Sequence, residues 1–343
     1  MERNSSIEVY RILATFAVLV FHFNGWLVGG MPKHFDMDNV SLFRITQALI
    51  EACTCICVNM FIIISGYFGI RLKFQSVLRI CLLLFSIHVP FYIIDCLFFD
   101  NIFQLKEFIK LSLVISNGGY FIQCYMMLMF LSPIINSFIE NNKVNGLYYC
   151  VFFLFVEFWF DCITHTDNIG FNHGYSVIHF VLIYMLARYL SLNKERFLEF
   201  KKQMWIFGYL LCSLIIFGMY LWDINYVWQY SNPIIIVSAF CSFIPFLYNS
   251  YLNENINWVA KSTLAVYIIH VTVPVYYIVK DIDNYCLLYY SYPFYLICMM
   301  GCSFAVFVIS IFYDKVRLLV TNPMERVLLL FFNNVMSHCK MVK

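Results

Sequence analysis

Apolar stretches of about 20 residues recur along almost the whole of this 343-residue chain, and this feature constrains its fold more than any other. A helix needs a stretch of about that length to cross the hydrocarbon core of a bilayer. Windows of this size predict about ten spans joined by short polar loops. Their approximate limits are 7–28, 48–70, 77–99, 120–139, 147–163, 176–193, 204–222, 232–250, 262–280 and 289–313. The sequence therefore predicts an all-α polytopic membrane helix bundle.

Charge and cysteine usage agree with a membrane protein. Charged residues make up only 12% of the chain, whereas soluble domains carry about a quarter. The formal net charge of +2 offers no footprint for a nucleic acid, so no nucleic-acid partner is expected. Most of the 14 cysteines lie inside apolar runs, where cysteine behaves as a small hydrophobic residue. We therefore expect neither disulfides nor a bound metal.

The distribution of lysine and arginine predicts the orientation. If the N-terminus is cytoplasmic, the inside loops hold about three times as many cations as the outside loops. This asymmetry places both termini in the cytoplasm and requires an even number of spans. Neither a linker nor an internal repeat divides the chain, so we expect one membrane domain over residues 1–320 and a cytoplasmic C-terminal tail over 321–343. The predicted location is the cell (inner or plasma) membrane.

The first predicted span carries three residues that are costly inside a bilayer: Glu8, Arg11 and His22. On a helix, Arg11 and His22 differ by three turns plus about 20° and are separated by roughly 16 Å, so they share one face with Glu8. Such a stripe usually faces the bundle interior or a polar path, and it marks a functional site. A structural interpretation stays open, in which Arg11 reaches the interface, Glu8 neutralises it and a neighbouring helix satisfies His22.

Two groups of polar residues mark the cytoplasmic end of the second span. They are Ser65, Gly66 and Tyr67 within it, and the cations Arg71, Lys73 and Arg79 after it. Cations beside a Ser-Gly turn suit a phosphate-rich ligand in the cytoplasm. The Ser-Gly pair could instead permit close helix packing, and the cations could be only the topological signal.

Five motifs, in order along the chain, resemble one known family. They are Arg11-x10-His22 introduced by Ser6-Ile7-Glu8, Phe61 to Tyr67, Tyr120 to Tyr125 with Leu131 to Asn136, Phe180 to Tyr184 with Arg188, and Ser262 to His270. Together they are similar to the acyltransferase-three family, integral-membrane O-acyltransferases best known for acetylating bacterial surface polysaccharides. The resemblance covers Ser5 to about Arg317. Where many members carry a tight Arg-x-x-Arg group, this chain has Arg71, Lys73 and Arg79.

The resemblance implies the chemistry and the partners. The acyl donor would be acetyl-CoA or a similar short acyl-CoA from the cytoplasm. The acceptor would be a carbohydrate hydroxyl, on a surface glycan or a lipid-linked precursor, recognised by the membrane part and its loops. No metal is implied, and the bilayer is the remaining partner.

The same resemblance suggests roles for the polar residues. His22 would be the catalytic group. It would act either as the general base for the acceptor hydroxyl or as the nucleophile whose ring nitrogen takes the acyl group. Arg11 would contact the pantetheine arm or orient Glu8. The cofactor-binding set would be Ser65, Gly66, Tyr67, Arg71, Lys73 and Arg79, with the three cations on the CoA phosphates. For His270 we favour a packed helix histidine.

The principal alternative is a transporter or exporter of a small organic acid or another solute. A polar stripe through a bundle is also how solutes cross a membrane. That class of protein is favoured by paired short or broken helices in equivalent halves, and the sequence shows no such symmetry.

Overall fold

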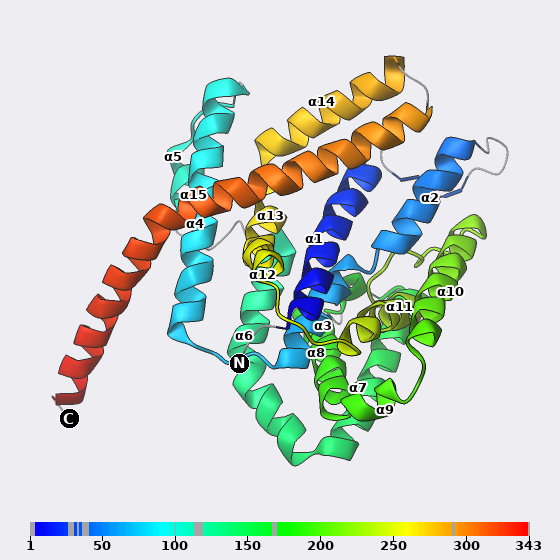
Figure 1. The fold of residues 1–343 in the computed structure, drawn as a ribbon, viewed down its shortest axis with the longest axis horizontal. Helices are drawn as coiled ribbons and strands as arrows, with labels where there is room; N and C mark the ends of the chain where they lie inside the picture. Colours follow the sequence, from blue (N-terminus) through cyan, green and yellow to red (C-terminus); the bar gives the residue numbers. More distant parts are fainter. Residues whose placement is uncertain are drawn as a thin grey trace.

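Helix α1 (Ser5–Trp26) runs through the middle of the bundle and is surrounded by other helices (Figure 1). In this computed structural model α1 packs against α2 (Leu42–Thr54), α3 (Cys57–Phe68), α12 (Glu254–Ala260), α13 (Thr263–Ile269) and α15 (Tyr292–Met341). Its buried side chains point in several directions, among them Ile7, Tyr10 and Leu19. A helix that is apolar on several faces belongs in the interior of a bundle.

The structure describes residues 4–26, 31–32, 34–35, 41–99, 101–112, 119–166, 170–289 and 292–341. The regular elements of these residues are helices, and no strand is found among them. The remaining longer helices are α4 (Phe74–Phe98), α5 (Leu105–Ser112), α6 (Gly119–Asn141), α7 (Lys143–Phe158), α8 (Val177–Leu192), α10 (Lys202–Leu221), α11 (Pro233–Phe243) and α14 (Val273–Tyr289). The short helix α9 (Lys194–Leu198) connects α8 to α10.

Within the described residues, seven helices are long and apolar enough to cross a membrane, or eight if one bent pair counts as a single span. Two further apolar helices, Val177–Leu192 and Pro233–Leu247, are shorter. Every one of the ten predicted spans coincides with helical structure. The prediction of an all-α polytopic membrane bundle is therefore confirmed.

The ninth predicted span, 262–280, is not one continuous helix. It bends by 83° between residues 254–269 and 273–286, so that α13 and α14 run in different directions (Figure 1). The hydroxyl of Thr272 donates to the carbonyl of Ile269 at 2.6 Å, and Pro274 has no N–H to continue the helical ladder. The segment predicted as one span is broken here because both residues favour a helix boundary.

Figure 1 places the start of α1 and the end of α15 toward the same, lower side of the bundle. This arrangement agrees with the predicted orientation, in which both termini face the cytoplasm. Helix α15 continues without a break through residue 320, with Pro323 inside it. The separate tail over 321–343 stays a prediction.

The Ser-Gly pair of α3 shows how closely two helices of this bundle approach. A Cβ at Gly66 would lie 2.5 Å from the backbone oxygen of Tyr184 and 2.7 Å from the Cβ of Ala187, both on α8. Only glycine fits this contact, because small residues allow membrane helices to pack backbone to backbone. The packing role that the sequence left open for the pair therefore applies to Gly66.

A buried polar network joins α3, α7 and α8. His179 Nδ1 lies 3.0 Å from Glu157 Oε2, and its Nε2 lies 2.9 Å from Asn59 Oδ1. The side-chain amide of Asn59 donates to the backbone oxygen of Tyr230 at 3.3 Å, which fixes the orientation of that amide. The His179, Glu157 and Asn59 side chains are fully buried, so their hydrogen bonds tie three helices together without help from water.

Replacing Glu157 with alanine is expected to destabilise the protein by about 3 kcal/mol, because a buried nitrogen of His179 loses its acceptor. Thermal unfolding of the purified protein in detergent measures this loss. Glu140→Ala is the matched control, since Glu140 is exposed on α6. Equal unfolding temperatures for the two variants would show that the network contributes nothing to stability.

Candidate active site

The polar residues of α1 lie along one side of the helix, as their spacing predicts. Glu8 is buried, and its Oε2 lies 3.4 Å from Arg11 Nη1. The hydroxyl of Thr15 donates to the backbone oxygen of Arg11 at 2.9 Å, so it is satisfied within the helix. Arg11 and Glu8 therefore form an ion pair in the N-terminal half of α1, and His22 lies near the other end of the helix.

A second histidine meets His22. Nδ1 of His22 lies 2.7 Å from Nε2 of His270, and the two rings meet edge to edge, with their planes inclined by 24° and their centroids 4.9 Å apart. His270 is fully buried and directly follows α13, at the bend that leads into α14. The contact joins residues 248 positions apart.

The hydrogen bonds of this pair determine where its protons lie. Nδ1 of His270 is 3.3 Å from the backbone oxygen of Val266, which can only accept, so this nitrogen carries the hydrogen. In the neutral ring, Nε2 of His270 is then an acceptor, and the N–H at Nδ1 of His22 donates a hydrogen bond to it. In this tautomer the other ring nitrogen of His22, Nε2, is an acceptor. This chain of donors resembles the arrangement by which a second residue fixes the tautomer of a catalytic histidine.

A cavity of about 200 Å³ lies beside α1 on the side that carries Arg11. It lies between α1, α3, α6 and α12–α13, and its polar lining includes Arg11, Ser65, Lys261 and Tyr267. The ring of Tyr267 contacts that of His270, with centroids 5.5 Å apart. Tyr267 therefore links the lining of the cavity to the histidine pair.

A second cavity, of about 350 Å³, adjoins the first at Lys261 and Leu264. Its cations are Lys261, Arg79 and Arg317. Arg79 pairs with Glu325 at 2.9 Å and Arg317 with Asp314 at 2.7 Å. Lys261 is exposed and forms no ion pair with another described residue, so it is the cation of this group that is most available to an anionic ligand.

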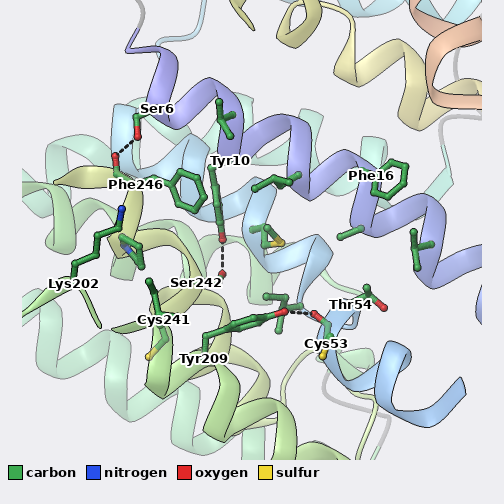
Figure 2. A pocket seen from close by; sticks show the side chains of 18 of the residues that line it. Ser6, Tyr10, Phe16, Cys53, Thr54, Lys202, Tyr209, Cys241, Ser242 and Phe246 are labelled. Carbon is green, nitrogen blue, oxygen red and sulfur yellow. Dashed lines mark hydrogen bonds between the residues drawn. The ribbon is translucent and has the colours of Figure 1, made fainter. Parts of the chain in front are cut away.

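A pocket of about 670 Å³ on the opposite face of α1 has a different character (Figure 2). Its polar groups bond to each other or to the backbone: Tyr10 to Ser242 at 2.8 Å, and Tyr209 to the backbone oxygen of Cys53 at 2.9 Å. Lys202 is the one cation in its lining. Among the described residues that line this pocket there is neither a histidine nor a cluster of cations, so the His22 side of α1 is the better candidate for a catalytic site.

Comparison with known families identifies the family of the chain. A family model described as an acyltransferase domain matches residues 4–312, which is most of the chain. The chain belongs to the acyltransferase-three family. No curated protein and no solved structure matches it. As a member of this family the protein is a multi-pass membrane acyltransferase, and the family assignment takes the place of the transporter alternative.

The structure places the predicted cofactor-binding residues of this acyltransferase in different surroundings. Ser65 lines the first cavity, whereas Gly66 contacts α8 and the Tyr67 ring packs against Phe243. Arg79 lines the second cavity. Arg71 and Lys73 are exposed in the segment before α4. Which of these residues bind a donor stays a prediction.

Three residues beside the cavities were not assigned to the site from the sequence: Lys261, Arg317 and His270. Lys261 and Arg317 were counted only as orientation signals, and His270 was expected to be a packing residue. One signal was present in the chain. His270 follows Lys261 by nine residues and His22 follows Arg11 by eleven, so each histidine comes after a cation along the chain.

Proposed function

We propose that this acyltransferase transfers an acetyl group from acetyl-CoA, bound from the cytoplasm, to a hydroxyl of a cell-surface polysaccharide or its precursor. It would be an O-acetyltransferase of the cell membrane. The observation that carries the proposal is a path of cations, from Arg79 and Arg317 through Lys261 to Arg11, beside the His22–His270 pair. The cations can bind the phosphates of the donor, and the histidine pair can take the proton of the acceptor hydroxyl.

The two adjoining cavities suit the two ends of the donor. The phosphates of CoA would lie at the wider cytoplasmic cavity against Lys261 and Arg317, where charge-assisted hydrogen bonds hold them. The pantetheine arm would follow the narrower cavity past Ser65 and Arg11. Movement of the Tyr267 ring would open the last step to the histidine pair, since side-chain rotation is fast on the scale of catalysis.

The chemistry of transfer follows from the protons of the pair. The acceptor oxygen bonds to the acetyl carbonyl carbon, and the bond between that carbon and the CoA sulfur breaks. The hydroxyl proton passes to Nε2 of His22 as the new bond forms, and the protonated His22 then gives this proton to the departing thiolate, which becomes CoA. The backbone oxygen of Val266 and the ring of His270 keep His22 in the tautomer that accepts the proton.

The same nitrogen supports a two-step route. Nε2 of His22 would first take the acetyl group and release the CoA thiolate, and the acceptor hydroxyl would then attack the acetyl-imidazole. Both routes place the reacting carbon at His22. They differ in whether labelled acetyl becomes attached to the protein before an acceptor is added.

Incubation of the purified protein in liposomes with acetyl-labelled acetyl-CoA tests the function directly. We expect release of CoA that depends on the protein, and transfer of label to a polysaccharide or lipid-linked glycan fraction. Faster use of a longer acyl-CoA would remove the acetyl assignment. Label found on protein or amines but absent from glycans would remove the proposed acceptor.

Replacing Lys261 with alanine is expected to raise KM for acetyl-CoA by about tenfold with little change in kcat, because a phosphate contact far from the chemistry is lost. Steady-state kinetics with varied acetyl-CoA measures the change. Lys315→Ala is the matched control: Lys315 is a cytoplasmic lysine that lies over Trp258 and lines neither cavity. An unchanged KM in Lys261→Ala would place the phosphates elsewhere, for example at Arg71 and Lys73.

Replacing Arg11 with alanine is expected to lower kcat/KM for acetyl-CoA by about tenfold or more, because the narrow cavity keeps Lys261 but loses the cation of Arg11, and Glu8 loses its ion pair. Arg11→Lys keeps the charge and should retain part of the activity. Binding of CoA by calorimetry separates the two roles. If the alanine variant binds CoA as tightly as the original protein does, Arg11 has only a structural role.

A further inference from the structure

Four polar side chains meet where α14 packs against α15, apart from the histidine pair. Asp283 and Cys286 belong to α14, and Cys298 and Cys302 belong to α15. Ligand atoms of Asp283, Cys298 and Cys302 all lie within 4.8 Å of one another. The sulfur of Cys286 lies 2.8 Å from that of Cys298.

The spacing of these residues explains why they converge. Asp283 and Cys286 are three positions apart, and Cys298 and Cys302 are four apart, so each pair projects from one face of its helix. The two helices are in contact, and the two faces meet. Two ligands from each of two packed helices are a common way to build a metal site within a bundle.

The carboxylate of Asp283 is the group that indicates a bound ligand. It is fully buried, and neither of its carboxylate oxygens has a hydrogen-bond partner of ordinary geometry among the described residues. The groups that face it are the thiols of Cys298 and Cys302. A buried carboxylate without a partner is costly in a membrane helix, whereas coordination of a cation would satisfy both oxygens.

We propose that Asp283, Cys298 and Cys302 bind a thiophilic divalent cation of the Zn²⁺ class. Two thiolates and one carboxylate are ligands that Zn²⁺ accepts, and a fourth position is within reach of Cys286 once its side chain rotates away from Cys298. Binding through Cys298 and Cys302 releases their two thiol protons to solvent. Hard cations such as Mg²⁺ and Ca²⁺ would not select this set, because they prefer oxygen ligands.

The position of the cluster suggests what the ion does. The α14–α15 hairpin reaches the side of the bundle opposite the two termini, which is the outer side in the predicted orientation (Figure 1). The ion would fasten α14 to α15 there, and α14 begins three residues after His270. The site is therefore a structural clamp, and it does not depend on which acyl group or acceptor the enzyme uses.

The test is the metal content of the full-length protein. The protein is purified in detergent under reducing conditions without chelator, and it is then equilibrated with one equivalent of Zn²⁺ and desalted. Its metal content is measured by elemental mass spectrometry. We expect about one ion per chain, and a content at least about tenfold lower in Asp283→Asn and in the double variant Cys298→Ser/Cys302→Ser. Co²⁺ in place of Zn²⁺ should give thiolate-to-metal charge-transfer absorption that both variants lose.

A matched double variant controls for the general loss of cysteine. Cys212 and Cys241 are buried on α10 and α11, two helices in contact. Cys212→Ser/Cys241→Ser should keep the metal content of the original protein. No retained metal in the original protein, or an equal loss in this control, would overturn the proposal. A third outcome would also overturn the proposal. If the protein holds no metal and lacks two titratable thiols that a reductant restores, Cys286 and Cys298 form a disulfide instead.

Discussion

Replacing His22 with alanine is expected to lower kcat for acetyl transfer by about four orders of magnitude while the protein still inserts and folds. Both routes use Nε2 of His22, the acceptor nitrogen that does not take part in the contact with His270, so both lose their reacting group. Release of CoA from acetyl-CoA, measured with a thiol reagent or with label, gives the rate. KM for acetyl-CoA should change little, because the cations of the two cavities stay in place.

The control for this variant is a histidine outside the site. His34 is exposed and bonds to Asp223, and His34→Ala should keep the original rate. Thermal unfolding of both variants shows whether the fold is retained. Normal acetyl transfer by a folded His22→Ala protein would remove His22 from the mechanism.

Replacing His270 with alanine is expected to lower kcat by about a hundredfold, a smaller loss than for His22. Its ring accepts the hydrogen on Nδ1 of His22, and without that acceptor His22 can adopt the other tautomer or rotate away. Glutamine offers an acceptor oxygen at a similar distance from the backbone. His270→Gln should therefore regain activity to within about tenfold of the original protein.

A purely structural role for His270 predicts a different result. The two variants would then lose activity in proportion to their loss of thermal stability, and glutamine would not rescue the rate. Equal kcat values for His270→Ala and the original protein would show that the contact with His22 is not used in the reaction. Stability is measured on the same samples, so the two explanations are separated without a further variant.

The stripe on α1 could be predicted from the sequence because it depends on one helix. Residues 8, 11 and 22 share a face whenever the segment is helical, whatever the rest of the chain does. The contact between His22 and His270 could not be predicted in the same way. It depends on a bend after residue 269, which two local features cause, and on the packing of helices from opposite ends of the chain.

The Ser65-Gly66-Tyr67 segment shows why a motif does not define a binding site by itself. Consecutive residues of a helix project about 100° apart, so three in a row cannot all face one cavity. Ser65 faces the cavity, Gly66 allows α8 to approach and Tyr67 packs on an aromatic ring of α11. The sequence predicted the segment and left the direction of each side chain open.

The cations of the cytoplasmic side show the same limit. Lysine and arginine on that side serve orientation first, and their number says nothing about which of them border a cavity. Arg79 was assigned to the donor from the sequence and lies at the wider cavity, whereas Lys261 and Arg317 reach it from other helices. Only the packing of α4, α12–α13 and α15 brings the three together.

The most direct test of the account is a structure of the protein with a non-hydrolysable acetyl-CoA analogue. The account predicts phosphates at Lys261, Arg79 and Arg317, and the carbonyl carbon about 3 to 4 Å from Nε2 of His22. An analogue bound in the pocket lined by Tyr10, on the other face of α1, would contradict it. So would an analogue on the proposed side whose carbonyl carbon stays about one helix diameter, roughly 10 Å, from His22.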